Sequence, residues 1–536
     1  MSTHASATAR TTLVQPASQA FTLSSLKQRL LPGTAPAGPL LWIIPLAATV
    51  LGGLLRFINL AHPHQLIFDE TYYVKDAYAL MHGGFERVWV DDSNDQFVAG
   101  DPQVKAEGSY VVHPPLGKWL IGLGMWLFGD FNGFGWRFST ALFGTLAVLL
   151  VTLCARLLFK SHALAAAAGL FLAIDGHSIV MSRTALLDIF LMFFILAAFY
   201  ALLKDREHGR AKLARLLAVP EGHRPSDLLL ATGPMLWWRP WRLAAAVMLG
   251  CAVGIKWSAL SFVAVFCLMA VLWDFAARRT AGIRRWQLAG FIKDGLYSFI
   301  TMMPLVLATY LATWTGWLVT HGGRYRNWAQ ENPGDGISWL PAPLRSLWHY
   351  HQSAYQFHTG LTSEHGWQSS PWTWLFAGRP VLFYFEGYDS GQHGCELKRC
   401  TEVITDLPNP VLWWACTISM FLLILWWAGA RDWRAGAILS SVAAGFLPWL
   451  MYPERTMFFF YTLPFTPFMM LALAYMLGKL LPREKRHLPG YWPRVIVLTV
   501  LVALLVLVSA FFWPIWSGQL TSDAFWKMHL WIPSWG

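Results

Sequence analysis

The sequence is poor in charge. Of its 536 residues, 13% are Asp, Glu, Lys or Arg, whereas 55% are hydrophobic. Soluble domains carry about a quarter charged residues, so this composition excludes a soluble catalytic domain of ordinary size and indicates a polytopic membrane protein. The formal net charge of +11 does not indicate a nucleic-acid partner, because the basic residues lie between apolar segments.

The sequence also lacks the motifs of several common enzyme classes. It has no Walker P-loop and no GxGxxG opening a helix after a strand, which argues against a soluble nucleotide donor. One stretch is rich in histidine, with His349, His351 and His358. No HExxH pattern accompanies it, and aromatic residues interleave throughout. We therefore predict neither a metal site nor a cofactor.

Cysteine is scarce, with six in the chain. Four lie in or beside apolar runs and are expected to be packing residues: Cys154, Cys251, Cys267 and Cys416. Cys395 and Cys400 instead enclose the short segment Glu-Leu-Lys-Arg in a long loop. If that loop faces an oxidising compartment, a disulfide between Cys395 and Cys400 can form.

Long apolar runs predict an all-α membrane protein with about eleven transmembrane helices. The expected spans are residues 41–60, 137–158, 161–180, 184–203, 241–256, 258–277, 296–318, 411–429, 434–451, 457–480 and 494–514. Residues 1–38 are rich in Ala, Thr, Ser and Pro and predict a disordered cytoplasmic tail. Residues 39–515 then form the membrane domain with external loops 62–136 and 319–410, and residues 516–536 form an external tail.

The charge of the connecting segments sets this topology. The segment Lys204–Arg242 carries eight Lys or Arg against four acids, and three later connectors are also basic. They contain Arg278, Arg279, Arg284, Arg285 and Lys293; Arg431 and Arg434; and Arg483, Lys485, Arg486 and Arg494. The positive-inside rule places all four in the cytoplasm. This arrangement holds if the short apolar run 116–128 does not cross but lies as an interfacial helix on the outer face.

In this topology, the polar residues that lie at the ends of the expected spans fall on the outer side of the membrane. They concentrate at helix ends, whereas a transporter would place some buried charges near the middle of the bilayer. This distribution indicates an enzyme that works at the outer leaflet.

The adjacent carboxylates Asp69 and Glu70 are the first candidates, although a solvated loop is the alternative. Cations that suit a phosphate-bearing substrate are Arg56, Arg137, Lys256 and Arg455. Candidates for a head-group or acceptor site are His113, Lys118, Arg183, Asp188, His365 and Gln368. Simple explanations compete: Arg137 and Lys256 could snorkel to the interface, and Arg183 and Asp188 could form a structural ion pair.

These residues carry a family resemblance. Ile67-Phe68-Asp69-Glu70-Thr71-Tyr72-Tyr73, His113-Pro114-Pro115-Leu116-Gly117-Lys118 and Arg137 at the start of a span resemble the protein O-mannosyltransferases. Ser182-Arg183-Thr184-Ala185-Leu186-Leu187-Asp188, Gly254-Ile255-Lys256-Trp257 and Gln368-Ser369-Ser370-Pro371-Trp372 add to it. The resemblance implies the glycosyltransferase type C fold. The long loop is too short for the β-trefoil insertion of the eukaryotic members, so the chain is most similar to the bacterial, actinobacterial enzymes.

The resemblance implies a polyprenyl-phosphate-mannose donor and a Ser or Thr hydroxyl of an exported protein as acceptor, with inversion at the sugar. It implies a plasma-membrane enzyme with an extracytoplasmic site, with the secretion translocon as a candidate partner, and without a divalent metal. Asp69 is the expected base, Glu70 organises the site, and Arg137 is the first candidate for the donor phosphate. Two alternatives remain: a related type C enzyme that moves another lipid-linked sugar, and a transporter for the lipid-linked sugar itself.

Overall fold

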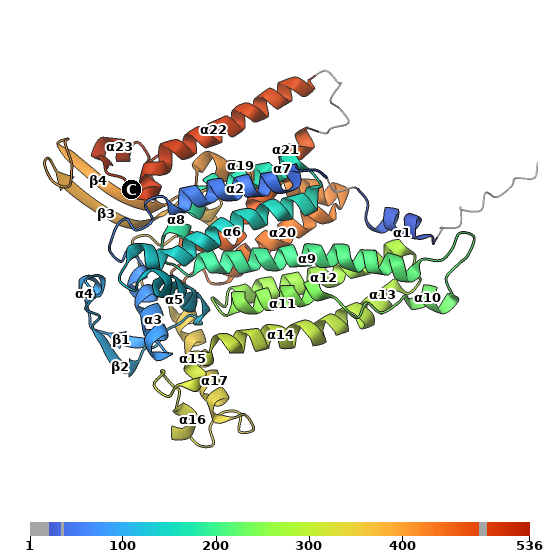
Figure 1. Cartoon of the computed structure of the whole chain (residues 1–536), viewed down its shortest axis with the longest axis horizontal. Helices are drawn as coiled ribbons and strands as arrows, with labels where there is room; N and C mark the ends of the chain where they lie inside the picture. The colour runs from blue at the N-terminus through green and yellow to red at the C-terminus, as the bar shows by residue number, and fades with distance from the viewer. Residues whose placement is uncertain (1–20, 34–36, 482–489) are drawn as a thin grey trace, which may run out of the picture. The chain divides into compact units, whose positions relative to one another are not determined.

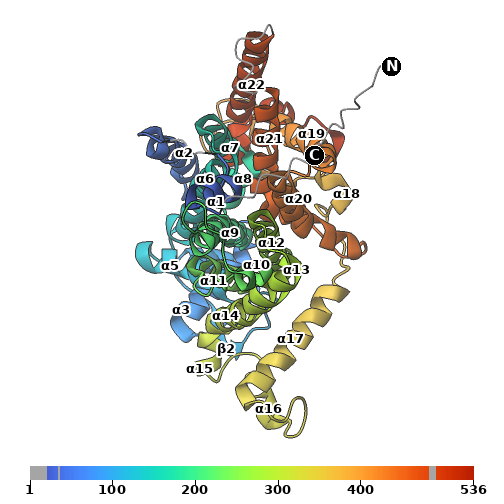
Figure 2. The ribbon, with the colours of Figure 1, turned by 90° about the vertical axis from the view of Figure 1, so that its right-hand side faces the viewer.

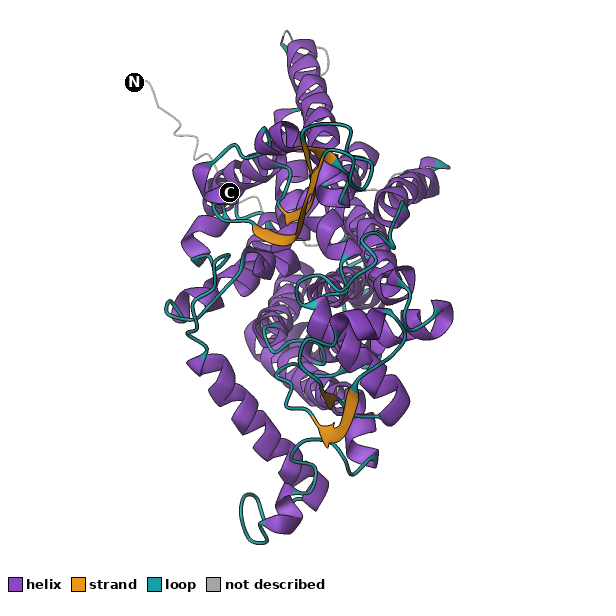
Figure 3. Cartoon of the chain, turned by 90° about the vertical axis from the view of Figure 1, so that its left-hand side faces the viewer, coloured by secondary structure: helices purple, strands orange, loops and turns teal. Residues whose placement is uncertain are grey.

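The computed structural model describes residues 21–33, 37–481 and 490–536, and most of them are helical (Figures 1 and 3). Its contacts divide the chain into two compact units. The smaller unit comprises the described part of residues 1–33 together with residues 206–239 and 271–297. The larger unit contains the rest and every candidate site residue.

The smaller unit is organised around the short helix α1 (Leu23–Leu30). Leu26 and Leu30, four residues apart on one face, are fully buried in an apolar cluster that also contains Leu213, Leu217, Leu230 and Ile283. The Thr22 side chain caps the helix by accepting from the Ser25 N–H. The expectation of a disordered tail is therefore wrong over Leu23–Leu30. Residues 1–20 and 34–36, and the basic connector at 482–489, lie outside the described residues.

Eight helices or helix runs in the described residues are long and apolar enough to cross a membrane. They are Leu40–Phe57 (α2), Gly133–Phe159 (α6), Ala259–Ala281 (α12), Trp286–Thr313 (α13 Trp286–Ala289, a π-helix and α14 Tyr297–Thr313), Pro410–Ala430 (α19), Trp433–Met451 (with α20 Trp433–Phe446), Phe459–Leu480 (with α21 Thr466–Leu480) and Tyr491–Ser517 (α22). A ninth arises if α7 (His162–Ile174) and α8 (Gly176–Arg183), bent by 56°, form one span. The protein is therefore a multi-pass membrane protein of the expected all-α class.

The two remaining expected spans correspond to α9 (Asp188–Leu217) and α11 (Pro240–Val253). At 14 residues, α11 is shorter than the roughly 20 residues that a span needs. The apolar part of α9 lies between Asp188 at its start and Lys204 with Asp205 inside it. The total of eleven spans therefore stays a prediction.

The loop after α2 folds into a compact set of short elements. These are α3 (Glu70–Gly83), β1 (Arg87–Trp89), α4 (Asn94–Val98), β2 (Val104–Gly108) and α5 (Leu116–Phe128), with β1 and β2 antiparallel. Helix α5 covers the 116–128 run and packs against α3 and α6. At 13 residues it is too short to span a bilayer, which agrees with its expected interfacial position.

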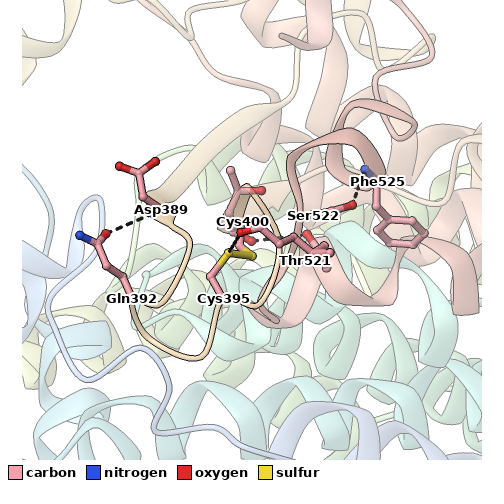
Figure 4. Close-up of a disulfide and its surroundings, with 9 residues drawn as sticks. Asp389, Gln392, Cys395, Cys400, Thr521, Ser522 and Phe525 are labelled. Atoms are coloured by element: carbon pink, nitrogen blue, oxygen red, sulfur yellow. Dashed lines mark hydrogen bonds between the residues drawn. A yellow bond between two sulfur atoms is a disulfide. The ribbon is translucent and has the colours of Figure 1, made fainter.

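The long loop after α14 contains four helices and a hairpin. The helices are α15 (Thr315–Val319), α16 (Trp328–Glu331), α17 (Ala342–Gly360) and α18 (Pro371–Trp374). Figure 2 shows α17, with α16 at its N-terminal end, outside the main helix bundle. The hairpin strands β3 (Val381–Asp389) and β4 (Arg399–Asp406) are antiparallel, and a disulfide joins Cys395 to Cys400 at its end (Figure 4).

The C-terminal segment folds back on that loop. Strand β5 (Thr521–Ser522) pairs with β4, so the sheet order is β3-β4-β5, and α23 (Asp523–Lys527) follows. The buried Trp535 donates its Nε1–H to the Ala377 carbonyl over 2.7 Å. Residues 516–536 and the loop 319–410 therefore pack together, which agrees with their expected position on one side of the membrane.

Candidate active site

The two adjacent carboxylates have different environments. Glu70, the first residue of α3, is fully buried and accepts hydrogen bonds from the Ile67 N–H at 3.0 Å and the Ala185 N–H at 2.8 Å. Arg137 of α6 donates to both of its oxygens, from Nε and from Nη2, each at 2.8 Å. Glu70 is therefore a structural anchor that ties the start of α3 to α6.

Arg137 has no donor left for a substrate. Its guanidinium is fully buried, and besides Glu70 it donates to the carbonyls of Leu60 at 3.4 Å, Pro63 at 2.8 Å and Gln65 at 3.0 Å. A guanidinium has five N–H donors, and these contacts use all of them. Arg137 therefore holds the loop that presents Asp69, and its assignment to the donor phosphate stays a prediction.

Arg56 is occupied in the same way. It is fully buried near the end of α2, and its five contacts are with the hydroxyls of Ser178 and Ser182 and the carbonyls of Gly52, Leu172 and Ala173. It clamps α2 to α7 and α8. The structure shows a structural role for Arg56, and its assignment to the phosphate stays a prediction.

Arg183 and Lys118 also point away from the expected site. Arg183 donates to the carbonyls of Arg56, Ile58 and Asn59, which end α2, and forms no ion pair with Asp188. Lys118 is 1% exposed and pairs with Glu86 at 2.5 Å and Asp76 at 3.9 Å. Lys118 is therefore held by buried acids and Arg183 by carbonyls at the end of α2, and their expected head-group roles stay predictions.

Lys118 nevertheless acts on a site residue. Its ammonium donates to the His113 carbonyl at 3.1 Å, so it fixes the backbone of the His113-Pro114-Pro115 segment. The His113 ring packs at 5.1 Å from His358 of α17 and 6.4 Å from Tyr73 of α3. Burial, with Lys256 as the next cause, lowers the pKa of His113 well below its usual range, so its imidazole is neutral at neutral pH.

Asp69 contrasts with its neighbour. Asp69 is a half-buried residue, and among the residues that the structure describes its carboxylate accepts no hydrogen bond. Burial raises the pKa of Asp69 to about 6, while the charge of Lys256 lowers it and that of Asp188 raises it. A carboxylate without a partner and with a pKa near the working pH suits a general base.

An ion pair lies beside Asp69. Lys256, in the turn between α11 and α12, donates to Asp188 at the start of α9 over 2.7 Å. The Lys256 ammonium also lies 5.8 Å from the Phe460 ring and 5.6 Å from the Tyr461 ring. One ammonium hydrogen is used by Asp188, which leaves donors for another anion.

Lys256 and Asp188 line a cavity of about 330 Å³. Its polar wall also contains His113, His358 and Arg455, and its apolar wall contains Leu191, Leu260, Phe262, Pro448, Trp449 and Pro464. Leu260 is 53% exposed on α12, so the cavity reaches the apolar outer surface. This combination suits an amphiphile with an anionic head and a hydrocarbon tail.

Arg455 is the cation of this cavity that lacks an acid. In the described parts of the chain its partners are the carbonyls of His358 at 3.0 Å and Thr456 at 3.1 Å, the Tyr461 hydroxyl at 3.3 Å and the His358 ring. Its guanidinium lies over the rings of Trp449 and Tyr461, at 5.5 and 5.6 Å. These contacts orient the guanidinium and leave its charge uncompensated, as an anion site requires.

Aromatic contacts fix the position of the residue that precedes Asp69. Phe68 has a left-handed backbone with a φ of 48°, which is costly for a bulky residue. Its ring stacks on Phe383 of β3 at 4.6 Å. The exposed His365 lies 6.4 Å from Phe68 and is held by Gln368, whose side-chain oxygen accepts from its N–H at 3.2 Å. His365 and Gln368 therefore lie beside the Asp69 loop, outside the cavity wall.

Sequence reasoning missed part of this arrangement. Phe68, Phe383, Trp449 and Tyr461 were not candidates, because aromatic residues near interfaces are common in membrane proteins. His358 was noted only for its histidine-rich surroundings. Its position opposite His113 depends on the return of α17 to the α3 loop, for which the sequence contains no local signal.

Comparisons with known proteins agree with this site. Residues 46–314 match the family model "Dolichyl-phosphate-mannose-protein mannosyltransferase", and residues 343–535 match "C-terminal four TMM region of protein-O-mannosyltransferase". The polyprenol-phosphate-mannose–protein mannosyltransferase of Mycolicibacterium smegmatis is 36% identical over 508 residues, which are 92% of this chain and 93% of that protein. The Corynebacterium glutamicum protein of the same name is 33% identical, over 88% of each chain.

The fold comparison agrees as well. A chain of the Saccharomyces cerevisiae protein O-mannosyltransferase Pmt1-Pmt2 complex, solved with its sugar donor, superposes with a TM-score of 0.68 at 15% identity, over 96% of this chain and 94% of that one. The expected type C glycosyltransferase fold is confirmed. With two family models and relatives above 30% identity over most of its length, the chain belongs to the polyprenol-phosphate-mannose–protein mannosyltransferases.

Proposed function

We propose that this protein transfers mannose from a polyprenyl-phosphate-mannose donor to Ser or Thr hydroxyls of exported proteins. One observation carries the proposal: the unpartnered Asp69 carboxylate lies close enough to Lys256 for their charges to interact, and Lys256 shares a cavity with Arg455. A base and a pair of cations beside one apolar cavity are what transfer from a lipid phosphate needs.

The donor would fill the cavity in one orientation. Its phosphate would lie against Arg455 and the remaining donors of Lys256, and its hydrocarbon chain would leave past Leu260. Arg455 and Lys256 take the place that the sequence assigned first to Arg137. Neutral His113 would supply a hydrogen bond to the head group without adding charge, whereas the His358 ring is used by the Val112 carbonyl and by Arg455.

The reaction is a single displacement. The acceptor hydroxyl attacks the anomeric carbon, Asp69 takes its proton, and the bond from that carbon to the phosphate oxygen breaks with the electron pair leaving on the phosphate. Arg455 and Lys256 stabilise the charge that grows on the leaving group. One displacement inverts the anomeric centre. The residues that perform it require no metal ion in this scheme.

The site would open to the outside of the plasma membrane. The positive-inside rule assigns the basic connectors to the cytoplasm, and so assigns the acidic loop that carries Asp69 and the loop that carries His358 to the outer side. An acceptor chain would meet the site while still unfolded, as it emerges from the secretion translocon.

The test is a transfer assay with the purified protein, a Ser/Thr peptide and several polyprenyl-phosphate sugars. We expect a mass increase of one hexose on the peptide with the mannose donor alone. Transfer of an arabinose or aminosugar in its place would favour the related type C reaction. Movement of the lipid-linked sugar across vesicles without any glycosidic product would favour a transporter.

A further inference from the structure

Strand β3 is an edge strand with an unpaired side. The sheet order β3-β4-β5 leaves one side of β3 without a neighbour, and β5 pairs with the other side of β4. Figure 1 shows β3 and β4 side by side, with α23 near β4. Among the described residues, the backbone of Val381–Tyr388 forms no hydrogen bond with any segment other than β4. Alternate N–H and C=O groups therefore point outward without a protein partner.

The exposed part of this edge is short and open. Phe385, Glu386 and Gly387 are exposed, whereas Val381, Phe383 and Tyr384 are buried. A Cβ added at Gly387 would meet nothing closer than 3.6 Å. The disulfide between Cys395 and Cys400 ties the loop beyond β3 to the start of β4 (Figure 4). The edge is thus a pre-ordered template for another strand.

A bulge fixes this edge next to Asp69. The register of β3 with β4 shifts between Leu382 and Tyr384, which leaves Phe383 as the unpaired residue. Bulges redirect a side chain, and here Phe383 stacks on Phe68 at 4.6 Å with the rings 15° from parallel. Phe68 directly precedes Asp69 in the chain. The position of the strand and the position of the base are therefore coupled through one pair of rings.

We propose that the outer edge of β3 binds the acceptor polypeptide as an added β-strand. This inference rests on the proposed function, because it names the site at which the acceptor of that reaction binds. An unfolded segment has N–H and C=O groups that need partners, and a free edge supplies them without reading side chains. A strand added beyond β3 passes Phe68 and presents every second side chain toward the side of Asp69.

Backbone N-methylation of a peptide acceptor tests the proposal. A peptide with a single Thr is made in versions that each carry one N-methyl group, at the three residues before and after the Thr. N-methylation removes an N–H donor and leaves the side chains unchanged. We expect the KM for the peptide to rise at least about tenfold at alternate positions and less than threefold at the positions between them. Equal effects at all positions would overturn the proposal.

A second experiment requires the peptide to bind but does not require mannose transfer. A photoreactive residue next to the Thr is expected to label the Val381–Asp389 segment of the wild-type protein, as mapped by mass spectrometry. Labelling confined to other segments would overturn the proposal. If the unmodified peptide gains no mannose, the proposed function fails, and this labelling still decides whether β3 binds the peptide.

The competing occupant is a second copy of the chain. Gly387→Cys would then form a disulfide-linked dimer in the absence of any peptide, whereas Ser390→Cys, at an exposed position just beyond the strand, serves as the matched control. We expect neither variant to dimerise, and Gly387→Cys to cross-link to a cysteine-containing acceptor peptide in preference to Ser390→Cys. A peptide-independent dimer of the Gly387→Cys variant would contradict the inference.

Discussion

Arg137 donates two hydrogen bonds of 2.8 Å to the Glu70 carboxylate, while the carboxylate of Asp69, the preceding residue in the chain, accepts none among the described residues. The two carboxylates thus have different roles. Glu70 is neutralised by a guanidinium and fixes the start of α3, and this leaves Asp69 available to take a proton. An adjacent acidic pair can serve this purpose because successive side chains point in different directions.

The Glu70–Arg137 pair is expected to be structural. Glu70→Gln keeps the shape of the side chain but leaves the buried Arg137 charge uncompensated, which costs about 3–5 kcal/mol of the free energy of unfolding. Arg137→Lys offers three N–H donors in place of five. We expect both variants to unfold at a lower temperature than the wild type in a detergent thermal-shift experiment. Glu107→Gln, at an exposed position of the same loop, should not change it.

An opposite result for Arg137 would restore its earlier assignment. If Arg137→Lys unfolds at the wild-type temperature but raises the KM for the lipid donor, Arg137 binds the phosphate and the structural interpretation fails.

Arg455 is expected to bind the donor phosphate. Arg455→Gln removes a charge-assisted hydrogen bond worth about 1.5–3 kcal/mol, so kcat/KM for the donor should fall at least about tenfold. Steady-state kinetics with varied donor and fixed peptide measure this effect. Lys398→Gln, at an exposed cation of the same external loop, is the control and should retain wild-type kinetics. Wild-type kinetics in Arg455→Gln would leave Lys256 as the phosphate residue.

The activity should fall in acid with a midpoint near the pKa of the base. Burial raises the pKa of Asp69 to about 6, and only the deprotonated carboxylate can accept the hydroxyl proton. Below that pH, kcat/KM should fall about tenfold per pH unit, and above it the rate should level off. Because Lys256 lowers this pKa, Lys256→Met should shift the midpoint upward. A midpoint that stays fixed or moves downward would rule out the assigned proximity.

Part of this site could be predicted from the sequence because its signal is local. Short motifs contain the Asp69-Glu70 pair, the His113-Pro114-Pro115 segment and Lys256, and the fold places these motifs at the site. The role of each cation could not be predicted, since that depends on partners far along the chain. Arg56 bonds to residues more than 110 positions away, and Arg137 to carbonyls more than 70 positions away.

The fold, like the site, could be predicted from the sequence only in part. Hydropathy located the long apolar helices, because burial in lipid requires about 20 apolar residues in a row. Hydropathy did not predict that α1 is an ordered helix. Two leucines on one face are enough to hold it in place, because a cluster of apolar residues from other segments surrounds them. Nor did hydropathy show the bulge at Phe383, which is fixed by its partner Phe68 rather than by any turn residue.

Labelling of single cysteines checks the expected topology. A cysteine in place of Gln103 or of the exposed Ser390 should react with an impermeant maleimide in intact cells, and one in place of the exposed Arg284 should react only after permeabilisation. The free native cysteines are buried or partly buried, which keeps the background low. Labelling at position 284 in intact cells would contradict the eleven-span arrangement and the external site.

The measurement that tests the central claim most directly is mannose transfer by Asp69→Asn. This change keeps the shape of the side chain and removes the proton acceptor. We expect turnover of a Ser/Thr peptide with polyprenyl-phosphate-mannose to fall by about two to four decades, the usual range for a general base, while the thermal stability and the affinity for the donor change little. Asp101→Asn, at an exposed position of the same loop, should transfer mannose at the wild-type rate. Near-normal turnover in Asp69→Asn would show that Asp69 is not the base.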